Sequence, residues 1–542
     1  MLMVTQHEVS LPLPPMEPQL WGTHDEAKPL SASIMEMLEK VLGATAEQVN
    51  RIDPRDIALS QVRLSDADLG ELAKIVGAEH VSTQHDQRLR RARGKSYPDL
   101  LDMRSAHIDA PDAVVAPATN EELAQLLQHC ARERIAVVTF GGGTSVVGGI
   151  TPKDGGLRAV ISVDMARFTE LSDVDPISGE ATLGAGLTGP HAEMLLAEHG
   201  LQLGHFPQSF PYATIGGYAA TRSSGQNSAG YGRFDEMVRS LTVVTPAGII
   251  KAGWNAPQSA AGPDLRQLFL GSEGTLGIIT SVRVRVHPIP ETKRYEAFRF
   301  PDFRAGAEAM RAVTQTGTGA TVLRLSDEME SAVNLSSTSA IGDSAASKNK
   351  GCLMLTMFEG TEAHTLSRHQ ETRELLLTLG GESAGEDPVR AWERGRFGAP
   401  VLRDGLMDNG AICETLETAT DWSNLFNLKR AVTEAITKAL ADSGTIPLVM
   451  CHISHVYATG ASLYFTIIGG QRGEPAQQWQ PIKERACEAI IAAGGTISHH
   501  HAVGTDHRPY LPGEIGEAGQ LLLQGIKAQL DPAGILNPGK LV

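Results

Sequence analysis

The sequence Phe140-Gly141-Gly142-Gly143-Thr144-Ser145-Val146 begins at the last residue of the apolar stretch IAVVTF (135–140). That stretch has the composition of a buried strand, so residues 140–146 are predicted to form a glycine loop at a strand end. Glycines let backbone N–H groups approach an anion, and the hydroxyls of Thr144 and Ser145 add donors. No GxxxxGK[ST] pattern occurs, and Lys153 lies too far along the chain to serve as a phosphate-loop lysine. We interpret the glycine loop as a cradle for a diphosphate.

A second glycine pattern, Gly184-x-Gly186-x-x-Gly189, has the spacing of a dinucleotide-binding fingerprint. The strand predicted before it is short, and Ser209 stands about 20 positions beyond, where a ribose-binding acid is expected. The pattern therefore favours a turn between a strand and a helix over a Rossmann-type site.

Three further segments, 207–225, 240–248 and 269–286, combine glycine with hydroxyl side chains. Together with the glycine loop they make the chain resemble the flavin-binding half of the vanillyl-alcohol oxidase type, in which several loops wrap an extended FAD. The resemblance implies that Gly141 to Ser145 cradle the diphosphate. It also implies that residues 214–217 and 221–224 line the ribityl and flavin side, and that residues 273–279 reach the adenosine end.

The FAD contacts implied by this resemblance come from all of these segments except the one at 240–248. They are Phe140, Gly141, Gly142, Gly143, Thr144, Ser145, Val146, Pro207, Gln208, Ser209, Thr214, Gly216, Gly217, Thr221, Arg222, Ser223, Ser224, Glu273, Gly274, Thr275, Gly277, Ile278 and Ile279. In covalent relatives a histidine occupies the place of Thr144. Threonine cannot form a histidyl bond to flavin, so non-covalent FAD is predicted.

The pattern along the chain predicts an α+β protein. We expect an N-terminal arm and helical preface at 1–112, a vanillyl-alcohol oxidase type FAD-binding domain at 113–290, a second α+β cap or substrate domain with an antiparallel sheet at 291–505, and a C-terminal helical tail at 506–542. A capping box at Thr119 and Glu122 predicts the start of a helix. The low-complexity stretch 334–351 is predicted to be a mobile loop or disordered.

Composition excludes several classes of function. The chain has 542 residues, with 47 Lys and Arg against 63 Asp and Glu, a formal net charge of −16. Such a charge opposes general attraction to nucleic acid, and an anionic substrate then needs a local basic site. Five widely spaced cysteines predict isolated buried thiols rather than disulfides. The first residues, MLMVTQHEVS, show no secretory pattern and no long apolar run occurs, so we expect a cytoplasmic protein.

A basic cluster occurs at Arg88, Arg90, Arg91, Arg93 and Lys95. Its more favoured interpretation is a solvated face, and the alternative is contact with phosphate.

A second group of chemically active residues is Ser498-His499-His500-His501-Ala502-Val503-Gly504. Three consecutive histidines are compatible with a metal-binding tract or with exposed residues that have no function. Adjacent side chains cannot all face one site in an extended chain, but two of the three can present imidazoles to one pocket. Imidazoles titrate near neutral pH and are suited to proton abstraction.

Upstream of the histidines lie CHISHVY (451–457) and ASLYF (461–465). With the histidines they resemble the flavin-dependent alkyldihydroxyacetonephosphate synthases of ether-lipid synthesis, and the resemblance runs from QLWGTHDE (19–26) to GGTISHHHAVG (494–504). It implies exchange of the acyl group of acyl-dihydroxyacetone phosphate for a fatty alcohol without net oxidation. The implied partners are a lipid-like phosphate ester and a long-chain alcohol, with a homodimer and peripheral membrane contact at the family level.

The same resemblance implies roles for individual residues. Tyr464, His499, His500 and His501 correspond to the catalytic residues, and Arg403 and Arg324 to substrate-contacting arginines. His452 takes a substrate-side position where the family has arginine, and TDHRPYL (505–511) replaces a lysine-bearing segment of the animal enzymes.

The main alternative is an FAD-dependent D-2-hydroxy-acid dehydrogenase, which the ending LDPAGILNPGKLV (530–542) resembles. Metal-using members carry HxGDGNxH and a later Glu-His-Gly, whose carboxylate completes the metal site. Here the first histidine aligns with His452, GDGN is missing and the glutamate position is His500, so no metal is predicted. A non-catalytic flavin-fold binding protein is a third possibility.

Overall fold

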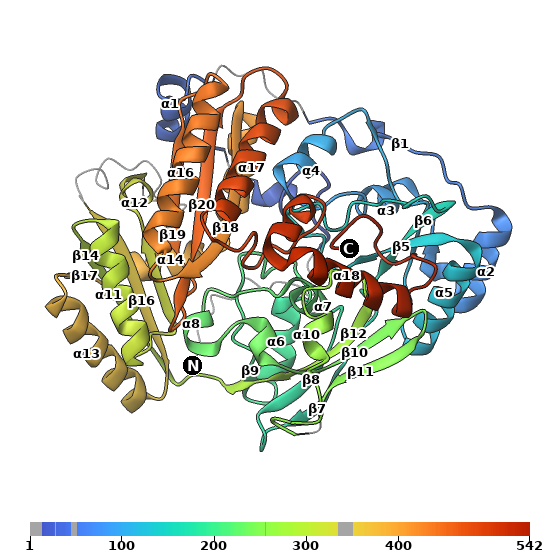
Figure 1. The fold of residues 1–542 in the computed structure, drawn as a ribbon, viewed down its shortest axis with the longest axis horizontal. Coiled ribbons are helices and arrows are strands. Elements are labelled where there is room, and N and C mark those ends of the chain that lie inside the picture. Colours follow the sequence, from blue (N-terminus) through green and yellow to red (C-terminus); the bar gives the residue numbers. More distant parts are fainter. Residues whose placement is uncertain (1–13, 28, 45–50, 255, 334–350) are drawn as a thin grey trace.

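The computed structural model describes residues 14–27, 29–44, 51–254, 256–333 and 351–542 (Figure 1). The low-complexity stretch 334–351, apart from Gly351, and residues 1–13 fall outside these residues. Before residue 113 the described chain forms short elements. They are α1 (Ala32–Lys40), β1 (Ala58–Leu59), α2 (Asp66–Val76), β2 (Val81–Ser82), α3 (His85–Leu89), α4 (Tyr97–Asp102) and β3 (His107–Ile108), with β1 and β3 paired in parallel.

The first sheet carries the glycine loop. Its order is β2, β4 (Ala113–Val115), β6 (Ala159–Asp164), β5 (Ile135–Phe140), and β6 pairs in parallel with both β4 and β5. The connection from β4 to β5 is α5 (Asn120–Glu133), where the Thr119 hydroxyl accepts from the Glu122 N–H. The Glu122 carboxylate accepts instead from the Ala118 N–H, one residue earlier than a capping box requires. The apolar face of α5, around Leu123 and Leu127, is buried against this sheet.

A second, antiparallel sheet lies beside the first. Its order is β11 (Gly248–Gly253), β10 (Val238–Thr245), β12 (Ile278–Arg285), β8 (Glu180–Gly184), β7 (Leu171–Asp175). In β12 the side chains of Val282 and Val284 are buried while those of Arg283 and Arg285 are more exposed, as alternation along a strand requires. The connecting elements are α6 (Gly189–Ala197), β9 (Leu201–Gln202), α7 (Ile215–Thr221), α8 (Ser228–Tyr231), α9 (Phe234–Met237), α10 (Arg266–Phe269) and β13 (His287–Pro288).

The C-terminal half is built on a seven-stranded antiparallel sheet, as predicted. Its order is β17 (Glu382–Gly385), β14 (Thr292–Phe300), β16 (Cys352–Gly360), β15 (Val322–Ser326), β19 (Leu448–Ile453), β20 (Gly460–Gly470), β18 (Ala411–Asp421). Its helices are α11 (Phe303–Thr316), α12 (Glu328–Val333), α13 (Glu362–Thr378), α14 (Asp387–Gly395), α15 (Ala399–Asp408), α16 (Leu425–Asp442) and α17 (Pro475–Ala492). Helices α11, α16 and α17 share one hydrophobic core with the sheet.

The chain returns to the first two sheets at its end. Helix α18 (Leu511–Leu530), red in Figure 1, lies beside the elements of the N-terminal half. Ile535 and Leu536 are buried in the core of the first sheet, where Leu536 forms a parallel bridge with Val137. We therefore propose that residues 506–542 belong structurally with the FAD-binding region rather than forming a separate tail.

The basic cluster does not form a solvated face. Arg88 and Lys95 are 6% and 4% exposed, and Lys95 Nζ donates to the carbonyls of Glu17, Pro18 and Leu20. Arg91 pairs with Asp164. The favoured interpretation is therefore wrong for these residues, because their donors are satisfied within the protein.

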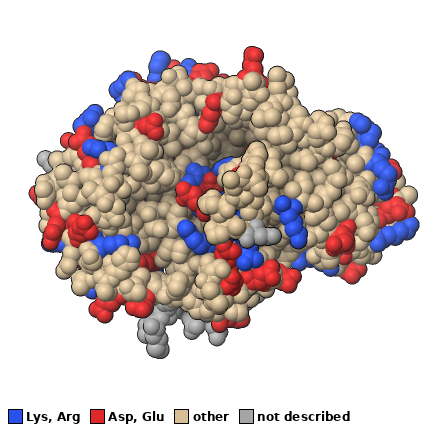
Figure 2. Space-filling model, turned by 60° about the horizontal axis from the view of Figure 1, so that its bottom comes forward, with Lys and Arg blue, Asp and Glu red and all other residues tan. Residues whose placement is uncertain are grey.

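The cysteine prediction is confirmed, since all five thiols are free and buried. Among the described residues, no helix is long and apolar enough to cross a membrane. Figure 2 shows acidic and basic side chains interspersed on one face of the molecule, around a hollow, with no basic patch gathered there.

Candidate active site

A cavity of about 330 Å³ lies between the two halves of the chain. The N-terminal half lines it with the predicted flavin segments, and the C-terminal half with the face of β18, β19 and β20 and with the connection from α14 to α15. Of the predicted FAD contacts, all but three line this cavity. The glycine loop and the segments 207–225 and 269–286 thus line one cavity, whereas the segment 240–248 does not.

The three exceptions are Phe140, Arg222 and Thr275. The Phe140 ring lies beneath the Arg91 guanidinium, and the Arg222 side chain turns away to pair with Asp235. The Thr275 hydroxyl donates to the Ser272 carbonyl inside its own turn. None of these three residues lines the cavity, so their assignment as FAD contacts stays a prediction without support from the cavity.

The glycine loop fits a diphosphate because two backbones meet there without side chains between them. A Cβ on Gly142 would lie 2.0 Å from the Tyr212 carbonyl oxygen, and one on Gly141 would lie 2.4 Å from Thr214 Oγ1. Only glycine permits this approach. The backbone of the glycine loop and the start of α7 therefore face the same part of the cavity, as a bound diphosphate requires.

Residues near the C-terminus fix the far side of the flavin region. Glu273 is buried, and it accepts the N–H groups of Val503 and Gly504 at 2.9–3.0 Å. Burial raises the pKa of Glu273 to about 7, although these N–H groups oppose the shift. The Asn537 amide donates to the carbonyls of Gly149 and Glu273. Sequence analysis missed Asn537, which no local motif distinguishes.

The sheet places three side chains in one row across adjacent strands. Tyr464 of β20 is directly opposite Glu417 of β18 on one side and His452 of β19 on the other. Directly opposite residues on adjacent strands share a face, so all three point the same way. The Tyr464 and His452 rings stack with their centroids 4.7 Å apart, and both line the cavity.

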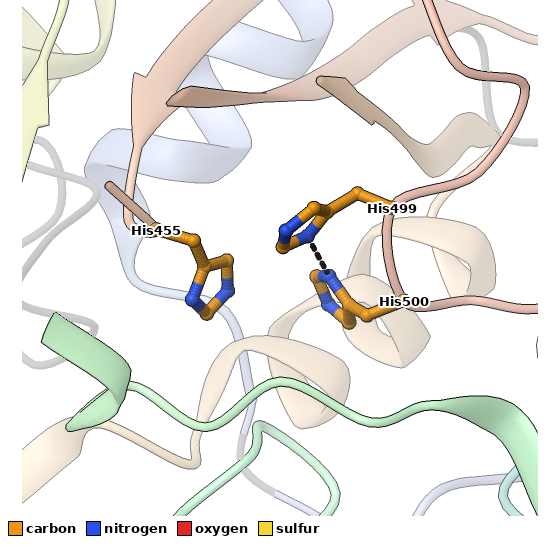
Figure 3. Close-up of side chains that lie close together, drawn as sticks. All are labelled: His455, His499 and His500. Carbon is orange, nitrogen blue, oxygen red and sulfur yellow. Dashed lines mark hydrogen bonds between the residues drawn. The ribbon is translucent and has the colours of Figure 1, made fainter. Parts of the chain in front are cut away.

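Two of the three consecutive histidines, His500 and His501, line the cavity, whereas His499 lies behind them. Figure 3 shows His455, His499 and His500 converging, with His499 Nδ1 3.0 Å from His500 Nδ1. On its other side His499 Nε2 is 2.5 Å from the Tyr457 hydroxyl. The histidines therefore form a hydrogen-bonded chain that runs from half-buried Tyr457 to the cavity.

Glu417 holds this histidine segment, and sequence analysis missed it. One carboxylate oxygen accepts the N–H groups of His500 and His501 at 2.5 and 3.0 Å. The other lies 3.4 Å from His499 Nδ1 and 3.2 Å from His500 Nδ1. Burial alone would raise the pKa of Glu417, but the imidazoles of His500 and His499 hold it well below its usual value. Glu417 is thus a buried anion that orients both backbone and imidazoles.

Burial decides the protonation states of these side chains. Burial lowers the pKa of His499 to about 4 and that of His501 to about 3, although Glu417 opposes both shifts. Burial also raises the pKa of Tyr464 to about 12. At neutral pH the two imidazoles are neutral acceptors and Tyr464 is a protonated donor.

Within the described part of the chain, two groups of side chains could hold a metal: His455, His499 and His500, and Glu417, His500 and His501. Metal-using relatives have a glutamate at the position of His500, and here Glu417 of β18 supplies a carboxylate to the second group instead. However, His455 Nδ1 already contacts the hydroxyls of Ser224 and Ser228, and His499 uses both nitrogens within the chain. The absence of a metal stays a prediction.

Both predicted substrate arginines line the cavity but are already paired. Arg324 donates to Glu330 at 2.5 Å and to Ser454, and it lies beside His452, which also pairs with Glu330. Arg403 is buried and donates to Asp404 and to the Lys95 carbonyl. Arg396, which sequence analysis did not single out, also lines the cavity.

Comparison with known proteins agrees with this geometry. The family model for an FAD binding domain matches residues 111–253, and that for FAD linked oxidases, C-terminal domain, matches residues 289–541. The alkyldihydroxyacetonephosphate synthase of Trypanosoma brucei brucei is 32% identical over 491 residues, covering 87% of this chain and 80% of the relative. The chain belongs to the alkyldihydroxyacetonephosphate synthase family. FAD is therefore its cofactor, as predicted.

Solved structures support this family membership. An alkyldihydroxyacetonephosphate synthase superposes with a TM-score of 0.81 at 26% identity, covering 97% of this chain and 99% of the other. p-Cresol methylhydroxylase, at 16% identity and a TM-score of 0.67, shares the fold alone. The D-lactate dehydrogenase (cytochrome) of Arabidopsis thaliana is 27% identical over 520 residues, covering 92% of this chain and 86% of that relative. The chain is therefore less similar to this dehydrogenase than to the 32% identical synthase.

Proposed function

We propose that this protein exchanges the acyl group of an acyl-dihydroxyacetone phosphate for a fatty alcohol, as the names of its 32% identical relatives suggest. The observation that carries the proposal is the composition of the cavity. Its lining combines proton-transfer side chains with apolar side chains that include Leu402, Leu406 and Ile468. A substrate with an aliphatic chain and a reactive ketone ester fits such a cavity. A small 2-hydroxy acid has no aliphatic chain that could pack against these apolar side chains.

The proposed reaction breaks one carbon–oxygen bond and forms another. The bond between C1 of the ketone and the acyl oxygen breaks, the bond between C1 and the alcohol oxygen forms, and a fatty acid leaves. The alcohol proton balances the acid released, so no electrons are gained or lost overall. Bound FAD supplies the ring system that activates the reacting carbon.

The chain's own residues manage the protons. We propose that His500 or His501 accepts the proton next to the ketone, and that Tyr464 donates a hydrogen bond to the oxygen that leaves or arrives. His499 lies behind them and links them to Tyr457. Arg403, Arg324 and His452 remain proposed contacts to the polar end of the substrate.

The experiment supplies the purified yellow protein with acyl-dihydroxyacetone phosphate and a fatty alcohol, and measures fatty-acid release. Alcohol-dependent release supports the proposal. A parallel sample receives D-lactate and D-2-hydroxyglutarate. Bleaching of the flavin by either acid, with no fatty-acid release, would instead support the dehydrogenase alternative.

Further expectations rest on the sequence and on the resemblance. We propose that FAD is held non-covalently, because Thr144 stands where covalent relatives have histidine. A cytoplasmic location, a homodimer and peripheral contact with a lipid surface also stay predictions.

A further inference from the structure

Three arginines line the cavity: Arg324, Arg396 and Arg403. Two of them have a carboxylate partner, since Arg324 pairs with Glu330 and Arg403 with Asp404. Over the described ranges of the chain, no carboxylate lies within ion-pair distance of Arg396. The nearby carboxylates of Glu359 and Glu393 are both bound by Lys293, at 2.8 and 2.9 Å.

Arg396 is nevertheless held in one orientation. It lies between α14 and α15, and its guanidinium carbon is 4.9–5.2 Å from the ring centres of Phe206, Trp392 and Phe397. Its Nε donates to Gln226 Oε1 at 2.7 Å, and one Nη donates to Asn227 Oδ1 at 3.0 Å. The second Nη makes no hydrogen bond to any residue that the structure describes.

A partly buried cation without a counter-ion is costly. Burial lowers the pKa of Arg396 to about 10, although Glu359 and Glu393 oppose the shift. The guanidinium therefore remains charged at neutral pH. Aromatic faces and amide oxygens reduce the cost of its burial but do not neutralise it.

A second donor beside Arg396 also lacks a partner. Gln226 Nε2 donates to Gln208 Oε1 at 3.4 Å, which joins Gln208 to the same network. Gln208 Nε2 is buried without a hydrogen-bond partner in the described structure, and Gln208 lines the cavity. An unpaired cation and an unpaired amide donor thus belong to one hydrogen-bonded group on the cavity wall.

We propose that Arg396 and Gln208 bind the phosphate of a phosphomonoester substrate. The inference rests on the proposed function and deepens it by assigning the anion site. A phosphate has several acceptor oxygens and can take the free Nη of Arg396 and the Gln208 amide together. The proposal also explains how phosphate can be bound although His452 stands where the family has a cationic arginine. His452 and Arg324 share Glu330, and Arg396 supplies the free cation.

The test measures binding of glycerol 3-phosphate to the FAD-loaded protein by calorimetry, in wild type and in Arg396→Gln, Arg396→Lys and Arg394→Gln. Arg394 lies in the last turn of the same helix α14 and is exposed, so its variant is a control for loss of one positive charge. We expect Arg396→Gln to weaken binding about 10- to 100-fold, as loss of a charged hydrogen bond does. Arg396→Lys should be intermediate because it keeps the charge but loses the fork. Arg394→Gln should bind as wild type does.

Several results would overturn the assignment. They are no binding by wild type, equal binding by wild type and Arg396→Gln, or loss of FAD from both Arg396 variants, which would make Arg396 a cofactor contact. If Arg396→Gln alone fails to fold, unchanged affinity in Arg396→Lys overturns it and weakened affinity supports it. D-lactate is a second probe, and dependence of lactate binding but not phosphate binding on Arg396 would also refute it. Arg396-dependent phosphate binding without acyl exchange would refute the proposed function and leave this inference standing.

Discussion

Replacing Glu417 with glutamine tests whether this buried carboxylate organises the histidine segment. The substitution keeps the shape of the side chain but replaces one carboxylate oxygen with an amide NH₂. If the remaining oxygen still accepts the N–H groups of His500 and His501, the new NH₂ must face the two imidazoles that now surround the second oxygen. The negative charge between them is lost in either orientation.

The expected cost follows from these contacts. A hydrogen bond to a charged acceptor contributes about 1.5–3 kcal/mol and one to a neutral acceptor about 1 kcal/mol, so two weakened backbone bonds lose about 2 kcal/mol. We therefore expect the free energy of unfolding to fall by about 2 kcal/mol at pH 7. Because a misplacement of about 1 Å can cost about 10²-fold in rate, we expect kcat to fall by about that factor with little change in KM.

The effect on stability should depend on pH. The folded-state pKa of Glu417 lies well below its usual value, so its contribution to stability is fully present above the unfolded pKa of about 4.3. That contribution is lost as the pH falls through the folded value. The difference between wild type and Glu417→Gln should therefore be largest near neutral pH and shrink in acid.

The assays are urea unfolding of the FAD-loaded protein at several pH values and turnover with saturating substrate. Glu434→Gln is the matched control, because Glu434 is an exposed residue of α16 that pairs only with Arg430 across the helix surface. We expect that control to change stability by less than about 0.5 kcal/mol. Equal stability and equal kcat in both variants would refute the role assigned to Glu417.

Three further predictions concern the tyrosine and the flavin region. Tyr464→Phe should lower turnover by about 10²–10⁴-fold while FAD stays bound, and an unchanged rate would remove Tyr464 from proton transfer. Acid precipitation should leave a colourless pellet and a yellow supernatant containing FAD, whereas a yellow pellet would show a covalent bond. Gly142→Ala should reduce FAD content on purification, because its Cβ would lie 2.0 Å from the Tyr212 carbonyl oxygen; full FAD content would show that this approach is not needed.

The flavin half was predictable because its signals are local. A glycine loop after an apolar strand, and the alternation that became β12, depend on neighbours within a few residues. The seven-stranded sheet was predictable in type, since the apolar stretches 352–360 and 462–470 have the composition of strands and lie in β16 and β20. Its strand order was not, because pairings between distant strands leave no local pattern.

The residues that sequence analysis missed are joined to the site by such distant pairings. Glu417 lies 83 residues before His500, and only the register of β18 against β20 and the path of the later chain bring them together. Arg396 differs from Arg324 and Arg403 in having no carboxylate partner among the described residues, and such pairings cannot be read from the sequence. The basic cluster was misjudged for the same reason, since the carbonyls that bind Lys95 come from residues 17–20.

Group exchange without net oxidation is tested most directly by incubating the FAD-loaded protein with acyl-dihydroxyacetone phosphate and a labelled fatty alcohol, with no electron acceptor present. The structure predicts that the label is recovered in an ether lipid that retains the phosphate, in an amount that matches the fatty acid released. No labelled ether, together with acceptor-dependent oxidation of a 2-hydroxy acid, would contradict it.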